Sequence, residues 1–189
     1  FFLMLRNNEQ VFALHTFTHI TSVNQYDDCY RFTSSSQYLN LRDIIGASPQ
    51  WALVNANYSF FRVDSVNVEI SPVFNPSIGT LGANTLPSPS LYLDFFPTDT
   101  STSKVFADLY ARDTAMVVSS FNRSPSDCMY RIPKYFTSKF GTMLPVTDIS
   151  NLPGEFIVSG YTPVVTGLVA TVCFEIMFTV YVTVSNDKA

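Results

Sequence analysis

Charged side chains are scarce in this chain. Only 14% of its 189 residues are Asp, Glu, Lys or Arg, whereas 47% are hydrophobic and 15% are aromatic. In soluble domains about a quarter of all residues are usually charged. A monomer with so little charge is poorly protected against association, so we expect apolar surface to be buried between subunits. The alternative is a well-packed sandwich whose outside is covered by Ser, Thr and Asn.

Clustered positive charge is missing as well. The 11 Lys and Arg are scattered and the net charge is −4, so these residues show no strong electrostatic footprint for nucleic acid. The chain begins Phe1-Phe2-Leu3 without an initiator Met. The possibility of a basic arm upstream of these residues therefore stays open. Residues 1–5 are too short for a signal-peptide core and lack a basic leader.

Residues that bind metals or form disulfides are few. The three cysteines, Cys29, Cys128 and Cys173, are odd in number and far apart, which argues against a disulfide framework and a zinc site and favours buried thiols. His15 and His19 are four apart in a strand-like pattern, which separates them by roughly 13 Å, too far to share one ion.

Catalytic motifs are also lacking. The sequence contains no G-x-S-x-G, H-E-x-x-H, P-loop or G-x-G-x-x-G pattern. The adjacent acids Asp27 and Asp28 point to opposite faces if they lie on a strand, so they do not form an acid–base pair. We therefore do not expect an enzyme, although a catalytic triad assembled in space stays open.

The strongest pattern is the apolar run Leu168–Val184, in which every even-numbered residue is hydrophobic and the odd-numbered ones are mixed. This period of two predicts a strand with one face wholly in the core. The period and Glu175 in mid-run do not fit a membrane helix. The run would extend about 55 Å, so we expect a bend, a bulge or a division.

A second strong strand is predicted over Tyr58–Phe74. Its hydrophobic phase slips at Asp64-Ser65, which predicts a β-bulge. Just before it, Ser48 as N-cap and Pro49 as first residue predict a short helix. Its apolar stripe holds Trp51, Val54 and Tyr58.

Weaker patterns complete the chain. We predict strands over Val11–Val23, Cys29–Thr33, Leu91–Phe96, Ala115–Phe121, Cys128–Phe136 and Glu155–Val158, a helical turn over Asn40–Gly46 with Asn40 as a possible cap, a helix over Ser103–Tyr110, and loops over Asn75–Ser90 and Thr137–Gly154. Pro133 favours an edge position for its strand. The loop Asn75–Ser90 is a candidate for contact with another subunit.

These elements predict an all-β protein with a single eight-stranded antiparallel jelly roll, made of two four-stranded sheets with short helices in the loops. Nothing in residues 1–189 resembles a linker or a repeat, so we expect one domain.

The segment Trp51–Pro72 resembles a stretch common in coat proteins of small icosahedral viruses: a Trp-bearing helix, an aromatic-Arg pair, then an alternating strand ending in Pro. Phe61 stands where Tyr is more usual. The segment Arg131–Lys134 is similar to the Pro/Lys-bearing strand of circovirus-like and satellite-virus coats. Gly167-Leu168 is similar to the start of the last strand in tombusvirus-like shell domains. The match spans about Val11–Val184.

This resemblance implies a capsid protein of the virion that self-assembles from 60 copies or a multiple. It would enclose viral RNA or single-stranded DNA through an upstream basic arm that is not present here, without contacting a membrane. Tombusvirus-like shells also hold interfacial calcium on clustered Asp residues. Asp94 and Asp99 are the candidates here, but no spacing reproduces that cluster.

Arg62, Arg131 and Lys134 are candidate contacts with a neighbouring subunit or with phosphate. For the two arginines the alternative is an ion pair with Asp64 or Glu69, or stacking on a ring.

Two other functions are possible on the same fold. A lectin- or receptor-like binding module would expose Trp51, Tyr92 and Asp94 around a ligand. A cupin-type enzyme would need a His/Glu metal cluster inside one barrel.

Overall fold

The structure is a computed structural model. It describes residues 9–21, 25–26, 29–31, 40–72, 90–96, 116–119, 126–131, 143–161 and 172–186. The predicted loop Asn75–Ser90 lies outside these ranges except for Ser90, which belongs to a strand. The predicted helix Ser103–Tyr110 lies outside them entirely.

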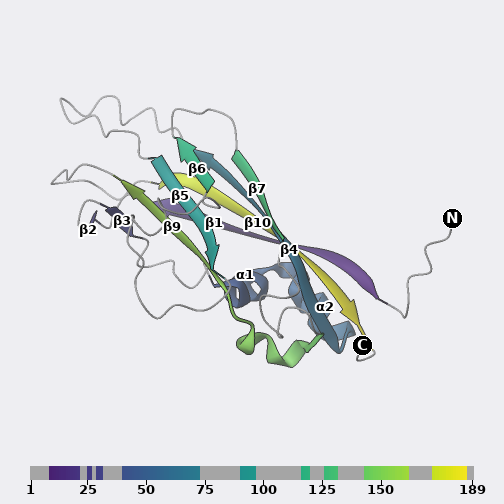
Figure 1. Cartoon of the computed structure of the whole chain (residues 1–189). Coiled ribbons are helices and arrows are strands. Elements are labelled where there is room, and N and C mark those ends of the chain that lie inside the picture. The colour runs from purple at the N-terminus through teal and green to yellow at the C-terminus, as the bar shows by residue number, and fades with distance from the viewer. Residues whose placement is uncertain are drawn as a thin grey trace, which may run out of the picture.

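Two antiparallel sheets make up the fold (Figure 1). Sheet A has the order β1 (Gln10–Thr21), β10 (Val172–Ser185), β4 (Phe60–Pro72) and β7 (Ser126–Arg131), with β8 (Leu144–Pro145) also pairing with β4. Sheet B has the order β2 (Gln25–Tyr26), β3 (Cys29–Arg31), β9 (Glu155–Tyr161), β5 (Ser90–Phe96) and β6 (Met116–Ser119).

The predicted jelly roll is confirmed. Neighbouring strands come from distant parts of the chain, as in a double Greek key. The order β1-β10-β4-β7 opposes the order β3-β9-β5-β6, which gives the eight expected strands. The two-residue strands β2 and β8 are additions at the edges of this frame.

Strand β10 confirms the alternation predicted for the carboxy-terminal run. The even-numbered residues from Ile176 to Val184 are all 0% exposed. The register shifts against β1 at Ile20/Thr21 and against β4 at Tyr181/Val182. These irregularities let one long strand stay paired on both sides while it twists.

The bulge predicted in β4 is present. Ser65 pairs with Tyr181 and Val63 pairs with Val182, which leaves Asp64 as the extra residue. Because of this insertion, the odd-numbered Phe61 and the even-numbered Val66 both enter the core.

Three phenylalanines join the two sheets. The ring of Phe178 in β10 lies 5.1 Å from that of Phe156 in β9, and Phe156 lies 5.0 Å from Phe95 in β5. All three are buried. Tilted ring contacts at this separation add to the free energy of burying the side chains.

Two helices, α1 (Leu41–Ala47) and α2 (Pro49–Asn57), pack on the core side of sheet A, beside the lower halves of its long strands in Figure 1. The Thr16 hydroxyl of β1 donates to the Ile44 carbonyl at 2.6 Å. Trp51 packs edge-on against Phe61, with ring centroids 5.0 Å apart. Within the described ranges, no helix is both long and apolar enough to span a membrane.

The helix starts are where the sequence predicts them, but the expected caps are not formed. Ser48 occupies the N-cap of α2, yet its hydroxyl donates to Gln50 Oε1 at 2.6 Å. Asn40, at the N-cap of α1, donates to Asp43 Oδ2 at 3.2 Å. Both side chains hydrogen-bond within the first turn rather than accept a backbone N–H.

The prediction of a loop over Thr137–Gly154 is wrong for its described part. Residues Leu144–Pro145 form β8, and a 3₁₀ helix, η3 (Val146–Asn151), follows. The Val146 N–H donates to the Ser59 carbonyl at 3.0 Å. Such long-range bonds leave no periodic signal in the local sequence. Gly154, with φ of 105°, turns the chain into β9 in a conformation that favours glycine.

Phe178→Ala tests the bridge between the sheets. We expect the free energy of unfolding to fall by about 3–5 kcal/mol, because a buried ring is lost and a cavity remains. Urea denaturation of dissociated subunits measures this. Val117→Ala removes an exposed side chain and serves as control, with an expected change within about 0.5 kcal/mol. A similar loss in both variants would contradict the role assigned to Phe178.

Candidate subunit-contact surface

The side of sheet A that faces away from the core is the first candidate surface, and we call it the outer face. Its described side chains are Val11, Ala13, His15 and Phe17 of β1, Glu175, Met177, Thr179, Tyr181 and Thr183 of β10, and Arg62, Asp64, Ser65, Asn67 and Glu69 of β4. Val11 and Phe17 are exposed. Exposed apolar side chains on an edge strand are typical of contact surfaces.

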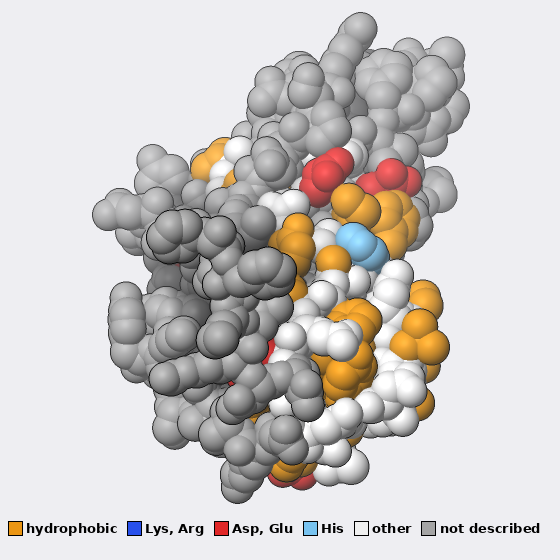
Figure 2. Space-filling view, turned by 90° about the vertical axis from the view of Figure 1, so that its right-hand side faces the viewer, with side chains coloured by type: hydrophobic (Ala, Val, Ile, Leu, Met, Phe, Trp, Pro, Cys, Tyr) orange, Lys and Arg blue, Asp and Glu red, His pale blue; other side chains and the backbone are white. Residues whose placement is uncertain are grey.

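His15 lies in the middle of this β1 stripe. Its Nδ1 is 3.2 Å from the Thr179 hydroxyl. Figure 2 shows one face of the molecule on which hydrophobic side chains gather among uncharged polar ones, with acidic side chains in its upper part. His19 pairs with Glu175 through the backbone. In the described part of the chain, no group of three His, Cys, Asp or Glu side chains is placed to hold a metal ion.

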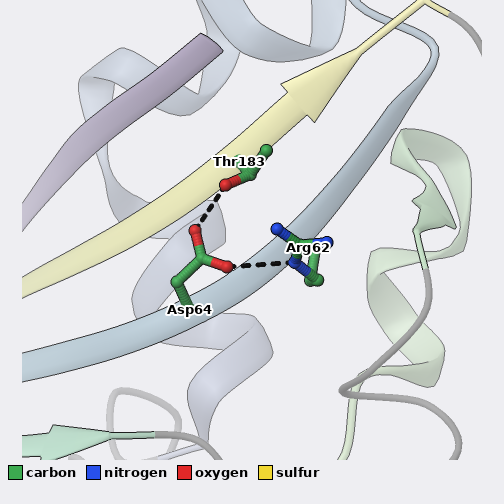
Figure 3. Close-up of polar contacts among 3 residues, drawn as sticks. All are labelled: Arg62, Asp64 and Thr183. Atoms are coloured by element: carbon green, nitrogen blue, oxygen red, sulfur yellow. Dashed lines mark hydrogen bonds and ion pairs between the residues drawn. The ribbon is translucent and has the colours of Figure 1, made fainter. Parts of the chain in front are cut away.

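Arg62, Asp64 and Thr183 form a polar cluster on the outer face (Figure 3). Arg62 Nε donates to Asp64 Oδ1 at 3.0 Å, and the Thr183 hydroxyl donates to Asp64 Oδ2 at 2.5 Å. The bulge produces this arrangement, because the inserted Asp64 turns its carboxylate toward β10. The ion pair between Arg62 and Asp64 is the structural alternative that the sequence left open.

Arg62 keeps unused donors. Its side chain is 21% exposed and that of Asp64 is 33% exposed. Among the described residues, the Arg62 side chain bonds only to Asp64, through Nε. Its two terminal nitrogens can therefore meet a carboxylate or a phosphate from outside the subunit.

Of the other predicted contact residues, the backbone places Arg131 beside this cluster, because Arg131 of β7 pairs with Ser65, the neighbour of Asp64 in β4. The side chain of Arg131 lies outside the described part of the structure, as do Lys134 and Asp99. Asp94 is only 1% exposed and accepts the N–H of Phe95 at 2.8 Å. Interfacial calcium at Asp94 and Asp99 stays a prediction.

Sequence reasoning missed a second surface. A hollow of about 760 Å³ lies beside α2, and we call it the α2 hollow. It is lined by Glu9, Gln10, Phe12, Leu53, Asn57, Tyr58 and Asn186. The signal that could have found it is the absence of charge: no Asp, Glu, Lys or Arg occurs between Asp43 and Arg62.

Two of the three side chains that a ligand-binding module would expose are buried, and the third, that of Tyr92, lies outside the described part of the structure. Trp51 is 8% exposed and packs on Phe61, and Asp94 is buried in β5. An aromatic ring and an acid inside the core cannot hold a sugar or a receptor ligand at the surface.

Thr183→Val tests the polar cluster. The substitution removes the hydroxyl that donates to Asp64, so we expect the free energy of unfolding to fall by about 1–2 kcal/mol, less than for a fully buried charged bond. Thr179→Val on the same strand removes only the 3.2 Å contact with His15 and should cost about 0.5 kcal/mol. Urea unfolding of both variants measures the difference, and equal losses would mean that Asp64 does not depend on Thr183.

No protein-family model matches the chain, and no curated protein sequence matches it. Solved structures do match. That of Cocksfoot mottle virus aligns over 96% of this chain and 86% of its own, with TM-score 0.60 and 10% identity. The 60-mer BFDV capsid protein aligns over 95% and 94%, with TM-score 0.54 and 13% identity. Tobacco necrosis virus aligns over 94% and 95%, with TM-score 0.55 and 12% identity. The chain has the jelly-roll fold of these viral coat proteins.

Proposed function

We propose that this chain is a structural coat protein whose copies associate into an icosahedral shell around a viral genome. The observation that carries the proposal is the reciprocal extent of the structural match. Nearly all of this chain aligns with nearly all of the 60-mer BFDV capsid protein, so the similarity is not that of a common subdomain. Fold alone does not establish function, and two further features support the same conclusion.

The first feature is chemical. The chain has few charges, and exposed hydrophobic side chains lie on β1, α2 and β6: Val11, Phe17, Leu53 and Val117. Surfaces depleted in charge and carrying apolar groups are those that subunits bury against one another. Closed assemblies need several such surfaces on each copy.

The second feature concerns the alternative functions. The described residues hold no candidate metal cluster, and the Trp51 and Asp94 side chains that a binding module would use are buried. Neither observation favours an alternative, so we propose a mechanical role, located in the virion.

The genome is the second proposed partner. The described residues carry few cations, and among them Arg62 has terminal nitrogens that could meet an outside anion. A basic arm upstream of Phe1 would supply most of the charge needed to hold nucleic acid. Calcium between subunits belongs to the same proposal, with Asp99 as the remaining candidate ligand, because Asp94 is only 1% exposed.

Purified protein should form particles. Sixty copies of a 21.2 kDa chain give a shell of about 1.3 MDa, which multi-angle light scattering resolves from a monomer. Negative-stain images should show closed particles tens of nanometres across. Protein that remains monomeric at micromolar concentration across pH and ionic strength, with and without calcium and nucleic acid, would contradict the proposal.

A further inference from the structure

The amino-terminal half of β1 has a free edge. Strand β1 ends the order of sheet A on its side, and in the described structure it pairs only with β10. The His15 N–H donates sideways to Gln50 Oε1 at 3.3 Å, away from β10. In an antiparallel pair the backbone groups of every second residue point the same way, and the register does not shift before Ile20. Val11 and Ala13 therefore direct their N–H and C=O groups at the free edge.

Nothing described pairs with these edge groups. Outside the strand ladders, no backbone hydrogen bond among the described residues involves Val11 or Ala13. Val11 also exposes 65% of its side chain, and in Figure 1 this end of β1 lies at the margin of the molecule. Unpaired backbone groups beside an exposed apolar side chain form a template for another strand.

The residues just before β1 have the composition of such a strand and its turn. Residues 1–5 are Phe-Phe-Leu-Met-Leu, and Asn7 and Asn8 follow after Arg6. Asn tolerates the positive φ that a two-residue hairpin turn requires at its central positions. With Asn7 and Asn8 as the turn, Arg6 lies opposite Glu9, and opposite charges are favourable at such a pair.

We propose that residues 1–5 form an additional strand along the free edge of β1, joined to it by a two-residue turn at Asn7-Asn8. The residues that flank such a turn exchange backbone hydrogen bonds, so Glu9 and every second residue after it must face the new strand. These are the odd-numbered residues that the His15 hydrogen bond places at the free edge. The turn in the sequence and the edge in the structure thus require the same pairing. The inference does not depend on the coat function.

The pairing decides which face each added side chain covers. Met4 lies opposite Val11 and covers it on the outer face. Leu3 lies opposite Phe12 on the core side, where the Phe12 ring already meets that of Tyr58 with centroids 5.5 Å apart. The apolar residues of the segment therefore meet apolar residues of β1 on both faces.

The edge also limits how far the new strand extends. Phe1 lies opposite Leu14, and the next edge position belongs to His15, whose N–H is taken by Gln50. A turn of two residues cannot reach another molecule, so the segment folds back on its own chain. An edge covered in this way no longer offers a site at which two copies pair strand to strand.

A disulfide tests the register. Leu3→Cys with Phe12→Cys places two thiols at a non-hydrogen-bonded pair, where Cα atoms lie about 4.5 Å apart, within disulfide range. Met4→Cys with Phe12→Cys is the matched control, because its thiols lie on opposite faces. After mild oxidation, peptide mapping separates the new bridge from any at the native cysteines. We expect an intrachain bridge in the first pair only, and circular dichroism checks that both variants fold.

Three results would overturn the hairpin. A bridge between two chains, visible as a dimer on a non-reducing gel, would assign the segment to a second copy. An equal yield in the control pair would contradict the register. No bridge in a folded chain would mean that the segment does not lie on β1.

Hydrogen exchange is a second test that leaves β1 unchanged. Met4→Pro removes an N–H that would donate to β1, whereas Leu3→Pro removes one that would face solvent. In Met4→Pro we expect the Val11 and Ala13 amides to exchange about tenfold faster than in the native chain. Leu3→Pro should stay closer to native, and the His15 amide should not change in either variant. Equally fast exchange of Val11 and Ala13 in the native chain and in Met4→Pro would contradict the proposal.

Discussion

The contact between Phe178 of β10 and Phe156 of β9 is the link on which the two-sheet structure depends. Strand β10 lies between β1 and β4, and its even-numbered side chains from Ile176 to Val184 are fully buried. The strand therefore lies at the centre of sheet A, and its buried row is the part of the common core from which Phe178 reaches sheet B. Since the two sheets bury each other's apolar faces, neither is expected to be stable without this row.

The inserted residue Asp64 lets the long strand β4 keep its apolar side chains in the core on both sides of the bulge. Without Asp64, the alternation of β4 would carry either Phe61 or Val66 to the wrong face. The insertion keeps both inside and leaves a carboxylate on the outer face, where Arg62 and Thr183 neutralise and bond it. The same irregularity thus serves packing and places a cation with unused donors at the surface. The side chains exposed on the outer face at the bulge therefore depend on how the core residues of β4 are packed.

Strands β1 and β4 extend past the contact between Phe178 and Phe156. Helices α1 and α2 cover this extended part of sheet A. They do so with residues such as Ile44 and Trp51. The arrangement leaves the far side of α2 exposed and uncharged, next to the α2 hollow. Helix α2 is therefore covered on its buried stripe, while its opposite flank carries no charge. This agrees with the scarcity of charge in the whole chain.

Local pattern determined much of this protein: the alternation of β10, the bulge at Asp64 and the start of α2 at Pro49 are all readable, because period and backbone preference are properties of neighbouring residues. Other features depend on partners distant in sequence. The pairing of β8 with β4, the burial of Asp94 and the hydrogen bond that joins Tyr58 to Gln10 leave no trace in any single segment. Only tertiary structure decided them, since strand order and register are set by non-local contacts.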